Sequence, residues 1–115
     1  MKAENPATGK LIKEYEEHSR EEVAQIIIET DSEYRQWRKT TFAHRRELLL
    51  EAAKVLRKNV ERYAKTMTLE MGKIITESRA EIEKCAWCCD YYAENAERFL
   101  ADEIIATDAN RSMVT

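Results

Sequence analysis

Three cysteines within five residues are the side chains of this sequence with the most obvious potential for chemistry. Cys85, Cys88 and Cys89 stand in the stretch CAWCC, and their spacing places all three on one face of a helix. Three thiolates suit zinc or copper(I), but a structural zinc site needs a fourth ligand. The two histidines, His18 and His44, stand on other predicted elements near helix starts. Because free cysteine is among the most buried residue types, core packing is the favoured interpretation, and no metal site is assigned.

The same stretch does not predict a cysteine nucleophile. A catalytic thiol usually lies near a helix start or beside a base, whereas these cysteines lie in the middle of a predicted helix. Met71–Lys73 (MGK) lacks the glycine-rich run of a phosphate-binding loop. Trp87, Tyr91 and Tyr92 recur at helical spacing, which is more typical of packing than of a stacking platform. The sequence therefore assigns no catalytic and no cofactor-binding residue.

The composition is that of one helix-rich domain. Hydrophobic residues make up 43% and charged residues 36% of 115 residues, which argues against disorder. The net charge is -3 and acidic and basic residues are interspersed, so neither a nucleic acid nor a membrane surface is an expected partner. No apolar run is long enough to span a membrane, and the N-terminal MKAENPATG lacks the apolar core of a signal peptide. A cytoplasmic location is expected.

The elements that would position any site are predicted to be mainly helical. The fold expected for residues 1–115 is three helices, a short N-terminal strand and the start of a C-terminal β-hairpin. The turn NPATG, residues 5–9, combines the only proline with one of two glycines and precedes a strand over residues 10–15. Ser19 and Glu22 form a capping box that starts the first helix, which ends near Trp37.

Two longer helices follow. The second is predicted over about residues 43–71, with Thr41 as its N-cap and Gly72 as a left-handed C-terminal cap. The third is predicted over about residues 76–100. Its apolar stripe is Ile75, Ser78, Ile82, Cys85, Cys89, Tyr92, Ala96 and Phe99. The spacing of apolar residues then changes from the helical period. EIIATDANRSMVT is typical of a short strand, a polar turn and the start of a second strand at Met113.

Taken in order, these motifs resemble the N-terminal segment of an NAD(P)-dependent aldehyde dehydrogenase. In that family an NPATG turn and a strand precede a helix that ends in tryptophan, matched here by Trp37. A long helix then opens with arginine and closes on an L(E)xGK motif, and the next helix carries E(A/S)xxE(I/V)…YYAxxA. The matching residues are Arg45 or Arg46, Leu69, Glu70, Gly72, Lys73, Glu77, Ser78, Glu81, Ile82, Tyr91, Tyr92, Ala93 and Ala96. The resemblance covers the whole chain, and the run from Glu83 to Glu103 is similar to members named succinate-semialdehyde dehydrogenase.

This resemblance implies a larger α/β fold with a Rossmann-like cofactor domain. Residues 1–115 would be a single segment in the N-terminal part of that domain, and residues 103–115 would start a hairpin of the sheet that joins subunits. Family members oxidise aldehydes to carboxylic acids with NAD or NADP through a cysteine thiohemiacetal. The nucleophile, the base and the cofactor loop lie beyond the equivalent of Thr115. The segment alone is therefore expected to be inactive and to bind no cofactor, with the rest of the chain and further subunits as its partners.

The resemblance also implies that one face of the third helix borders the substrate tunnel, at positions that align with Ala80 and Lys84. The Lys84 ammonium would then favour substrates with a remote carboxylate, such as succinic semialdehyde; a simply solvated lysine is the alternative. An alternative for the chain as a whole is a free-standing helical interaction module derived from such a segment. A module of that kind would bury the seam from Cys85 to Phe99 within its own three helices.

Overall fold

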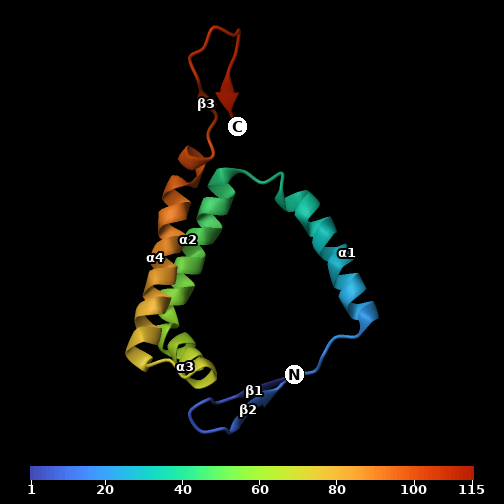
Figure 1. The fold of residues 1–115 in the computed structure, drawn as a ribbon, viewed down its shortest axis with the longest axis vertical. Helices are drawn as coiled ribbons and strands as arrows, with labels where there is room; N and C mark the ends of the chain where they lie inside the picture. Colours follow the sequence, from blue (N-terminus) through green and yellow to red (C-terminus); the bar gives the residue numbers. More distant parts are fainter.

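The computed structural model describes residues 1–115 as four helices and two short β-hairpins (Figure 1). Along the chain the elements are β1 (Lys2–Glu4), β2 (Leu11–Glu14), α1 (Arg20–Trp37), α2 (Phe42–Lys58), α3 (Val60–Met71), α4 (Ile75–Phe99), β3 (Glu103–Ile104) and β4 (Met113–Val114). The mainly helical character agrees with the sequence-based prediction. The predicted number of helices was wrong, because four are present and not three.

The NPATG turn links β1 to β2, which pair antiparallel. The backbone amides of Thr8 and Gly9 both donate to the Asn5 carbonyl, at 3.2 and 2.7 Å. The Asn5 side chain also accepts from the Ala7 amide at 2.9 Å, so the carbonyl and the side chain of Asn5 both stabilise the turn. Gly9 has φ +67°, the left-handed conformation that glycine adopts without a steric cost. The predicted strand over residues 10–15 is confirmed as β2, whereas its partner β1 was not predicted.

The capping box at the start of α1 forms as the sequence predicts. The Glu22 amide donates to Ser19 Oγ at 3.1 Å, and the Ser19 amide donates to the Glu22 carboxylate at 2.7 Å. Hydrogen bonds from Ser19 to the carboxylate lower the pKa of Glu22. Beyond the other end of α1, Arg45 Nε donates to Thr40 Oγ1 at 2.8 Å and its Nη2 donates to the Trp37 carbonyl at 3.0 Å. Arg45 therefore ties the end of α1 to the start of α2.

Asn59 divides the single long helix that the sequence predicts over residues 43–71. Its backbone leaves the helical region, with φ −115° and ψ 20°, and its side-chain amide donates to the Val55 carbonyl at 2.8 Å. Asparagine competes in this way for backbone partners, which is why it is unfavourable within helices. The chain re-enters helical geometry at Val60, so α2 and α3 are separate helices on either side of one residue.

The buried core consists almost entirely of small side chains between α2, α3 and α4. It comprises Ala53, Ala64, Ser78, Ile82, Ala86 and Ala93. The predicted role of the cysteines as core residues was wrong, since Cys85 and Cys88 are exposed and Cys89 is only partly covered. A stripe with a mean spacing of 3.5 residues drifts around a helix that has 3.6 residues per turn. The face of α4 that is covered therefore passes through Ala86 instead of Cys85.

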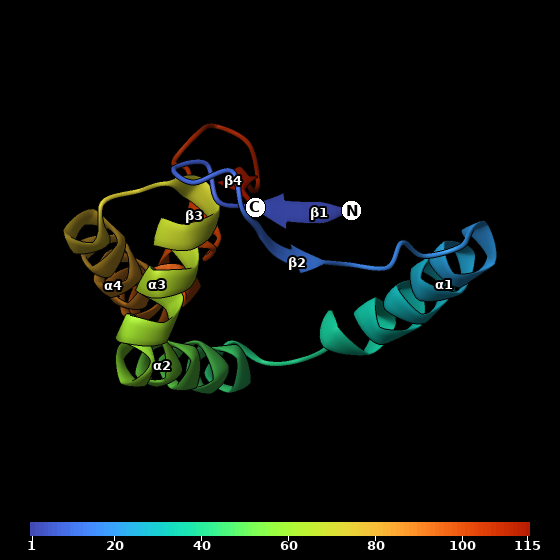
Figure 2. The ribbon, with the colours of Figure 1, turned by 90° about the horizontal axis from the view of Figure 1, so that it is seen from below.

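The molecule is extended, and most of its apolar surface has no cover. Its radius of gyration is 20.7 Å, whereas a compact domain of this length has about 13 Å. Figure 2 shows α1 standing apart from the group formed by α2, α3 and α4. No residue of α1 is buried, and Trp37 at its end is 42% exposed. The α2–α4 group is therefore the only part with a core of its own.

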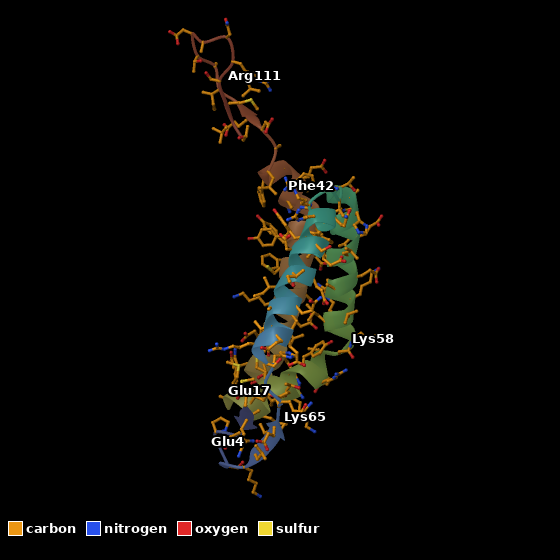
Figure 3. All side chains as sticks on the ribbon, turned by 90° about the vertical axis from the view of Figure 1, so that its right-hand side faces the viewer. Glu4, Glu17, Phe42, Lys58, Lys65 and Arg111 are labelled. Carbon is orange, nitrogen blue, oxygen red and sulfur yellow. The ribbon has the colours of Figure 1, made fainter.

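The second hairpin projects beyond the ends of the helices. β3 and β4 pair antiparallel, with Glu103 opposite Val114 and Ile104 opposite Met113. Figure 3 shows the loop that carries Arg111 as the part of the chain farthest from α3. The strand–turn–strand prediction for this region is confirmed. None of the helices combines the length and the apolar character that crossing a membrane requires.

The first hairpin packs against the helices at Gly72, the residue that follows α3. Gly72 ends α3 in the left-handed conformation, φ +71°, as the sequence predicts, and its amide donates to the Thr68 carbonyl at 3.0 Å. A Cβ atom on this residue would lie 2.9 Å from Cγ of Pro6. The proline of the NPATG turn thus rests against the end of α3, in a space that only glycine leaves open.

Replacing Gly72 with alanine should destabilise the protein more than the same change at Gly9. Both positions have positive φ, which costs an alanine about 1–2 kcal/mol. Only at Gly72 does the new methyl group also meet Pro6, and overpacking of this kind costs a further ~1–3 kcal/mol. Chemical denaturation of Gly72→Ala, Gly9→Ala and Pro6→Ala/Gly72→Ala measures the difference. Equal losses for the two single variants, with no recovery in the double variant, would contradict the contact.

Candidate functional site

An open hollow on one face of α4 brings together the two residues that the sequence analysis associates with a substrate tunnel. It is lined by Lys73, Glu77, Ala80, Glu81, Lys84, Cys85 and Cys88. Ala80 and Lys84 are one helical turn apart and therefore share a face. The hollow also contains two of the three cysteines, which the sequence analysis placed in the core. If the predicted buried stripe had passed through Ala86 instead of Cys85, the sequence analysis would have placed both cysteines on the uncovered side of α4.

The charges in the hollow are only partly neutralised. Lys73 lies just before α4 and its ammonium forms an ion pair with the Glu81 carboxylate. The side chain of Lys84 makes no hydrogen bond and no ion pair with any other residue, and the same holds for the side chain of Glu77. Lys84 and Glu77 are seven residues apart, about 10 Å along the helix axis. The hollow therefore has one free cation near its cysteine end and one free carboxylate near its other end.

The thiols differ in their surroundings. Burial raises the pKa of the Cys89 thiol, with a further contribution from the neighbouring cysteines. Cys85 and Cys88 are exposed in the hollow. No three histidine, cysteine, aspartate or glutamate side chains are arranged so that they could hold a metal ion. The histidines, His18 and His44, are both exposed and lie on or near other helices.

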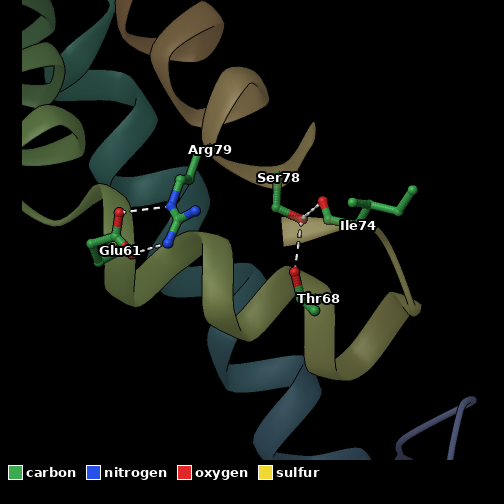
Figure 4. Close-up of polar contacts among 5 residues, drawn as sticks. All are labelled: Glu61, Thr68, Ile74, Ser78 and Arg79. Atoms are coloured by element: carbon green, nitrogen blue, oxygen red, sulfur yellow. Dashed lines mark hydrogen bonds and ion pairs between the residues drawn. The ribbon is translucent and has the colours of Figure 1, made fainter. Parts of the chain in front are cut away.

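Buried and charged contacts between α3 and α4 fix the helix that carries the hollow (Figure 4). The hydroxyl groups of Ser78 and Thr68 are 3.0 Å apart, and Ser78 Oγ also donates to the Ile74 carbonyl at 3.3 Å. Ser78 is fully buried, so both bonds are shielded from water. Two turns of α3 closer to its start, the Arg79 guanidinium donates twice to the Glu61 carboxylate, at 2.8 Å each.

A second clamp acts between α2 and α4. Arg57 Nη2 donates to the Asp90 carboxylate at 2.6 Å, and its Nε lies 3.7 Å from the Glu83 carboxylate. The hydrogen bond with Asp90 raises the pKa of Arg57, whose guanidinium is in any case charged at neutral pH. The two clamps and the small core together set the position of α4 relative to both neighbours.

The only glycines, Gly9 and Gly72, occupy a hairpin turn and a helix end. A second groove lies between the start of α2 and the end of α4, and its charged lining is mixed, with Arg45, Arg46 and Glu97 among its residues. The hollow beside Lys84 is the better candidate because its free groups come from one helix face.

Comparison with known proteins decides the family. The sequence model of the aldehyde dehydrogenase family matches residues 1–115, the entire chain. The chain belongs to this family. The probable NADP⁺ succinate-semialdehyde dehydrogenase of Synechocystis is 40% identical over 110 residues, and NADP⁺ succinate-semialdehyde dehydrogenase 1 of Mycobacterium tuberculosis is 40% identical over 99 residues.

Solved structures give the same family assignment. The crystal structure of succinic semialdehyde dehydrogenase from Streptococcus pyogenes with NADP⁺ matches 97% of this chain with a TM-score of 0.89 and 29% identity. The match covers 25% of that structure's chain, and the curated relatives are covered over 24% and 22% of their lengths, with 96% and 86% of this chain aligned. The chain therefore spans about a quarter of the length of the relatives that it matches.

The Glu61–Arg79 pair should make stability depend on acid pH. Its hydrogen bonds lower the pKa of Glu61 from the ordinary value of 4.5. The stabilisation is thus complete above the unfolded-state pKa and is lost as pH falls through the lower folded-state pKa. Thermal unfolding of Arg79→Met between neutral and acid pH should show a shallower acid loss than the unaltered protein.

Arg98→Met is the matched control for this prediction, because Arg98 also lies on α4 but donates only to the neutral side chain of Asn95. It should leave the acid slope unchanged. The same slope for Arg79→Met and the unaltered protein would show that the pair contributes nothing to the pH dependence.

Proposed function

We propose that this chain is the N-terminal segment of an NADP⁺-dependent aldehyde dehydrogenase and that the residues performing the chemistry lie outside it. The overall reaction converts an aldehyde, water and NADP⁺ into a carboxylate, NADPH and two protons. A cysteine in the remainder of the protein attacks the aldehyde carbon to give a thiohemiacetal. The part played by the present segment is to form one wall of the substrate passage and to pack against the cofactor domain.

The family match over the whole chain carries this proposal, together with the share of the relatives that it covers. The physical state of the helices supports it as well. Only six of 115 residues are buried, although the sequence has a normal apolar content. Apolar residues of α1 such as Ile27, 63% exposed, would gain stability from contact with the rest of such a protein.

The segment itself does not fit a nucleotide. The connection from β2 to α1 contains no glycine and so lacks the glycine-rich turn that usually holds a pyrophosphate, and we assign the cofactor to the remainder of the protein. The preference for NADP⁺ over NAD⁺ is proposed from the curated relatives, which are named as NADP⁺ enzymes.

The alternative, a free-standing interaction module, requires that the third predicted helix be covered within the chain. Cys85 is exposed, Tyr92 is 50% exposed and Phe99 is 47% exposed. This uncovered seam favours a segment of a larger assembly. By resemblance to the family, the β3–β4 hairpin at residues 103–115 would contribute to a sheet between subunits of a homo-oligomer.

For the substrate, we propose aldehydes that carry a carboxylate at the far end of a short chain. Lys84 points to this class because it is the unpaired cation of the hollow, and Ala80 one turn earlier leaves room for an aliphatic chain. Succinic semialdehyde has this chemistry and is the substrate named for the relatives in Synechocystis and Mycobacterium tuberculosis.

The first test is an activity assay with the complete protein that contains this segment. Succinic semialdehyde and NADP⁺ should give NADPH and succinate in equal amounts, and the 115-residue chain alone should give none. Butanal, a neutral aldehyde of the same carbon count, tests the charge preference. Absence of NADPH formation with every aldehyde would overturn the dehydrogenase proposal.

The role of Lys84 is tested in the same complete protein by Lys84→Met, with Lys84→Arg as the matched variant that keeps the charge. Loss of the ammonium should lower kcat/KM for succinic semialdehyde by about three- to tenfold relative to butanal, the range expected for one charge-assisted contact that solvent partly screens. Lys84→Arg should retain most of the preference. An unchanged ratio of the two substrates in Lys84→Met would leave Lys84 as an ordinary solvated lysine.

A further inference from the structure

Two exposed thiols line the hollow, and the proposed function gives them no task. Cys88 lies one helical turn after Lys84, and both residues line the hollow on the surface of α4. Cys85 lies one turn after Glu81, whose carboxylate is already engaged by Lys73. Among the two thiols, Cys88 is therefore the one beside an unpaired positive charge. The other free charge of the hollow, Glu77, is eleven residues earlier, about 16 Å along the helix.

We propose that Cys88, with Cys85 beside it, is a site of mixed-disulfide formation with small anionic disulfides, and that the attached group obstructs the substrate passage. Glutathione disulfide represents this chemical class, because it carries a net negative charge and a disulfide accessible to a thiolate. An accessible thiol near a lysine is the arrangement in which cysteine reacts selectively. Both the obstruction and the access of a disulfide to Cys88 in the complete protein rest on the proposed function, in which the hollow faces the substrate passage.

The chemical step is thiol–disulfide exchange. The Cys88 thiolate attacks one sulfur of glutathione disulfide, a new S–S bond forms, and the original S–S bond breaks. One glutathione leaves as a thiolate and takes up from water the equivalent of the proton that Cys88 gave up. Cys88 is oxidised and the departing glutathione is reduced, so no other reactant is needed. Lys84 attracts the carboxylates of the incoming disulfide and afterwards pairs with those of the bound half.

Cys89 provides a comparison within the same helix. It is adjacent in sequence, yet it is partly covered, and burial raises the pKa of its thiol. Both properties slow exchange, since the thiolate is the attacking species. The structure thus predicts that Cys88 reacts before Cys89, although one peptide bond separates them.

The test treats the complete protein with glutathione disulfide or with cystamine, a cationic disulfide, and measures adducts at each cysteine by peptide mass spectrometry. Rates are divided by those of a free cysteine peptide with the same reagent. Cys88 should react faster than Cys89, and Lys84→Met should slow the glutathione reaction by about two- to fivefold without slowing cystamine. Lys84→Arg should behave as the unaltered protein does. No adduct at Cys88 or Cys85, or a Lys84→Met rate that is unchanged with both reagents, would overturn the proposal.

The effect on turnover is measured separately. Treated samples of the unaltered protein and of Cys88→Ser are each compared with their own untreated activity on succinic semialdehyde, so that adducts at other cysteines contribute to both. A larger loss in the unaltered protein, reversed by dithiothreitol, is expected. Equal losses would overturn the obstruction. Because adduct mapping does not require turnover, a protein that is modified at Cys88 but oxidises no aldehyde would fail the proposed function alone.

Discussion

Close contact between small side chains is the constraint on which the rest of this structure depends. Ala53 on α2, Ala64 on α3 and Ala86 on α4 are completely buried, and side chains of this size let helix axes approach closely. Because these side chains contribute little apolar volume, polar contacts set the orientation of α4 relative to α2 and α3. These contacts are the Ser78–Thr68 hydroxyl pair and the ion pairs of Arg57 and Arg79. The same rotation of α4 that buries Ala86 turns Lys84 and Cys88 outward into the hollow.

The local signals in the sequence predicted local structure well. The Ser19–Glu22 capping box, the Thr41 cap and the left-handed Gly72 are each specified by residues within a few positions, and each formed as expected. The division at Asn59 was missed because the apolar period continues through it. At Asn59 the side-chain amide competes with backbone amides for the Val55 carbonyl, and this competition separates α2 from α3.

The face of α4 was harder to predict, for a physical reason. The apolar residues of α4 lie on more than one side of the helix. The sequence does not show which of these sides is covered by neighbouring helices. Cysteine and alanine both suit a buried position, so composition favoured Cys85 where packing selected Ala86. The family resemblance came from the order of several motifs, and the assignment of Ala80 and Lys84 to a substrate tunnel stays a prediction. The thiols beside them emerged only from the packed helices.

The extended shape leaves much of this recognisable segment without contacts to other elements of the chain. A chain of this composition normally buries a larger fraction of its surface, and here α1 and the seam of α4 remain open. The hollow is open for the same reason, because its residues come from one helix and the connection before it. The proposed substrate passage would need further walls, and those walls would decide how strongly solvent screens the Lys84 charge from a substrate. Under the proposed function, the contribution of Lys84 to specificity would depend both on this segment, which fixes the position of Lys84, and on the surfaces that exclude water around it.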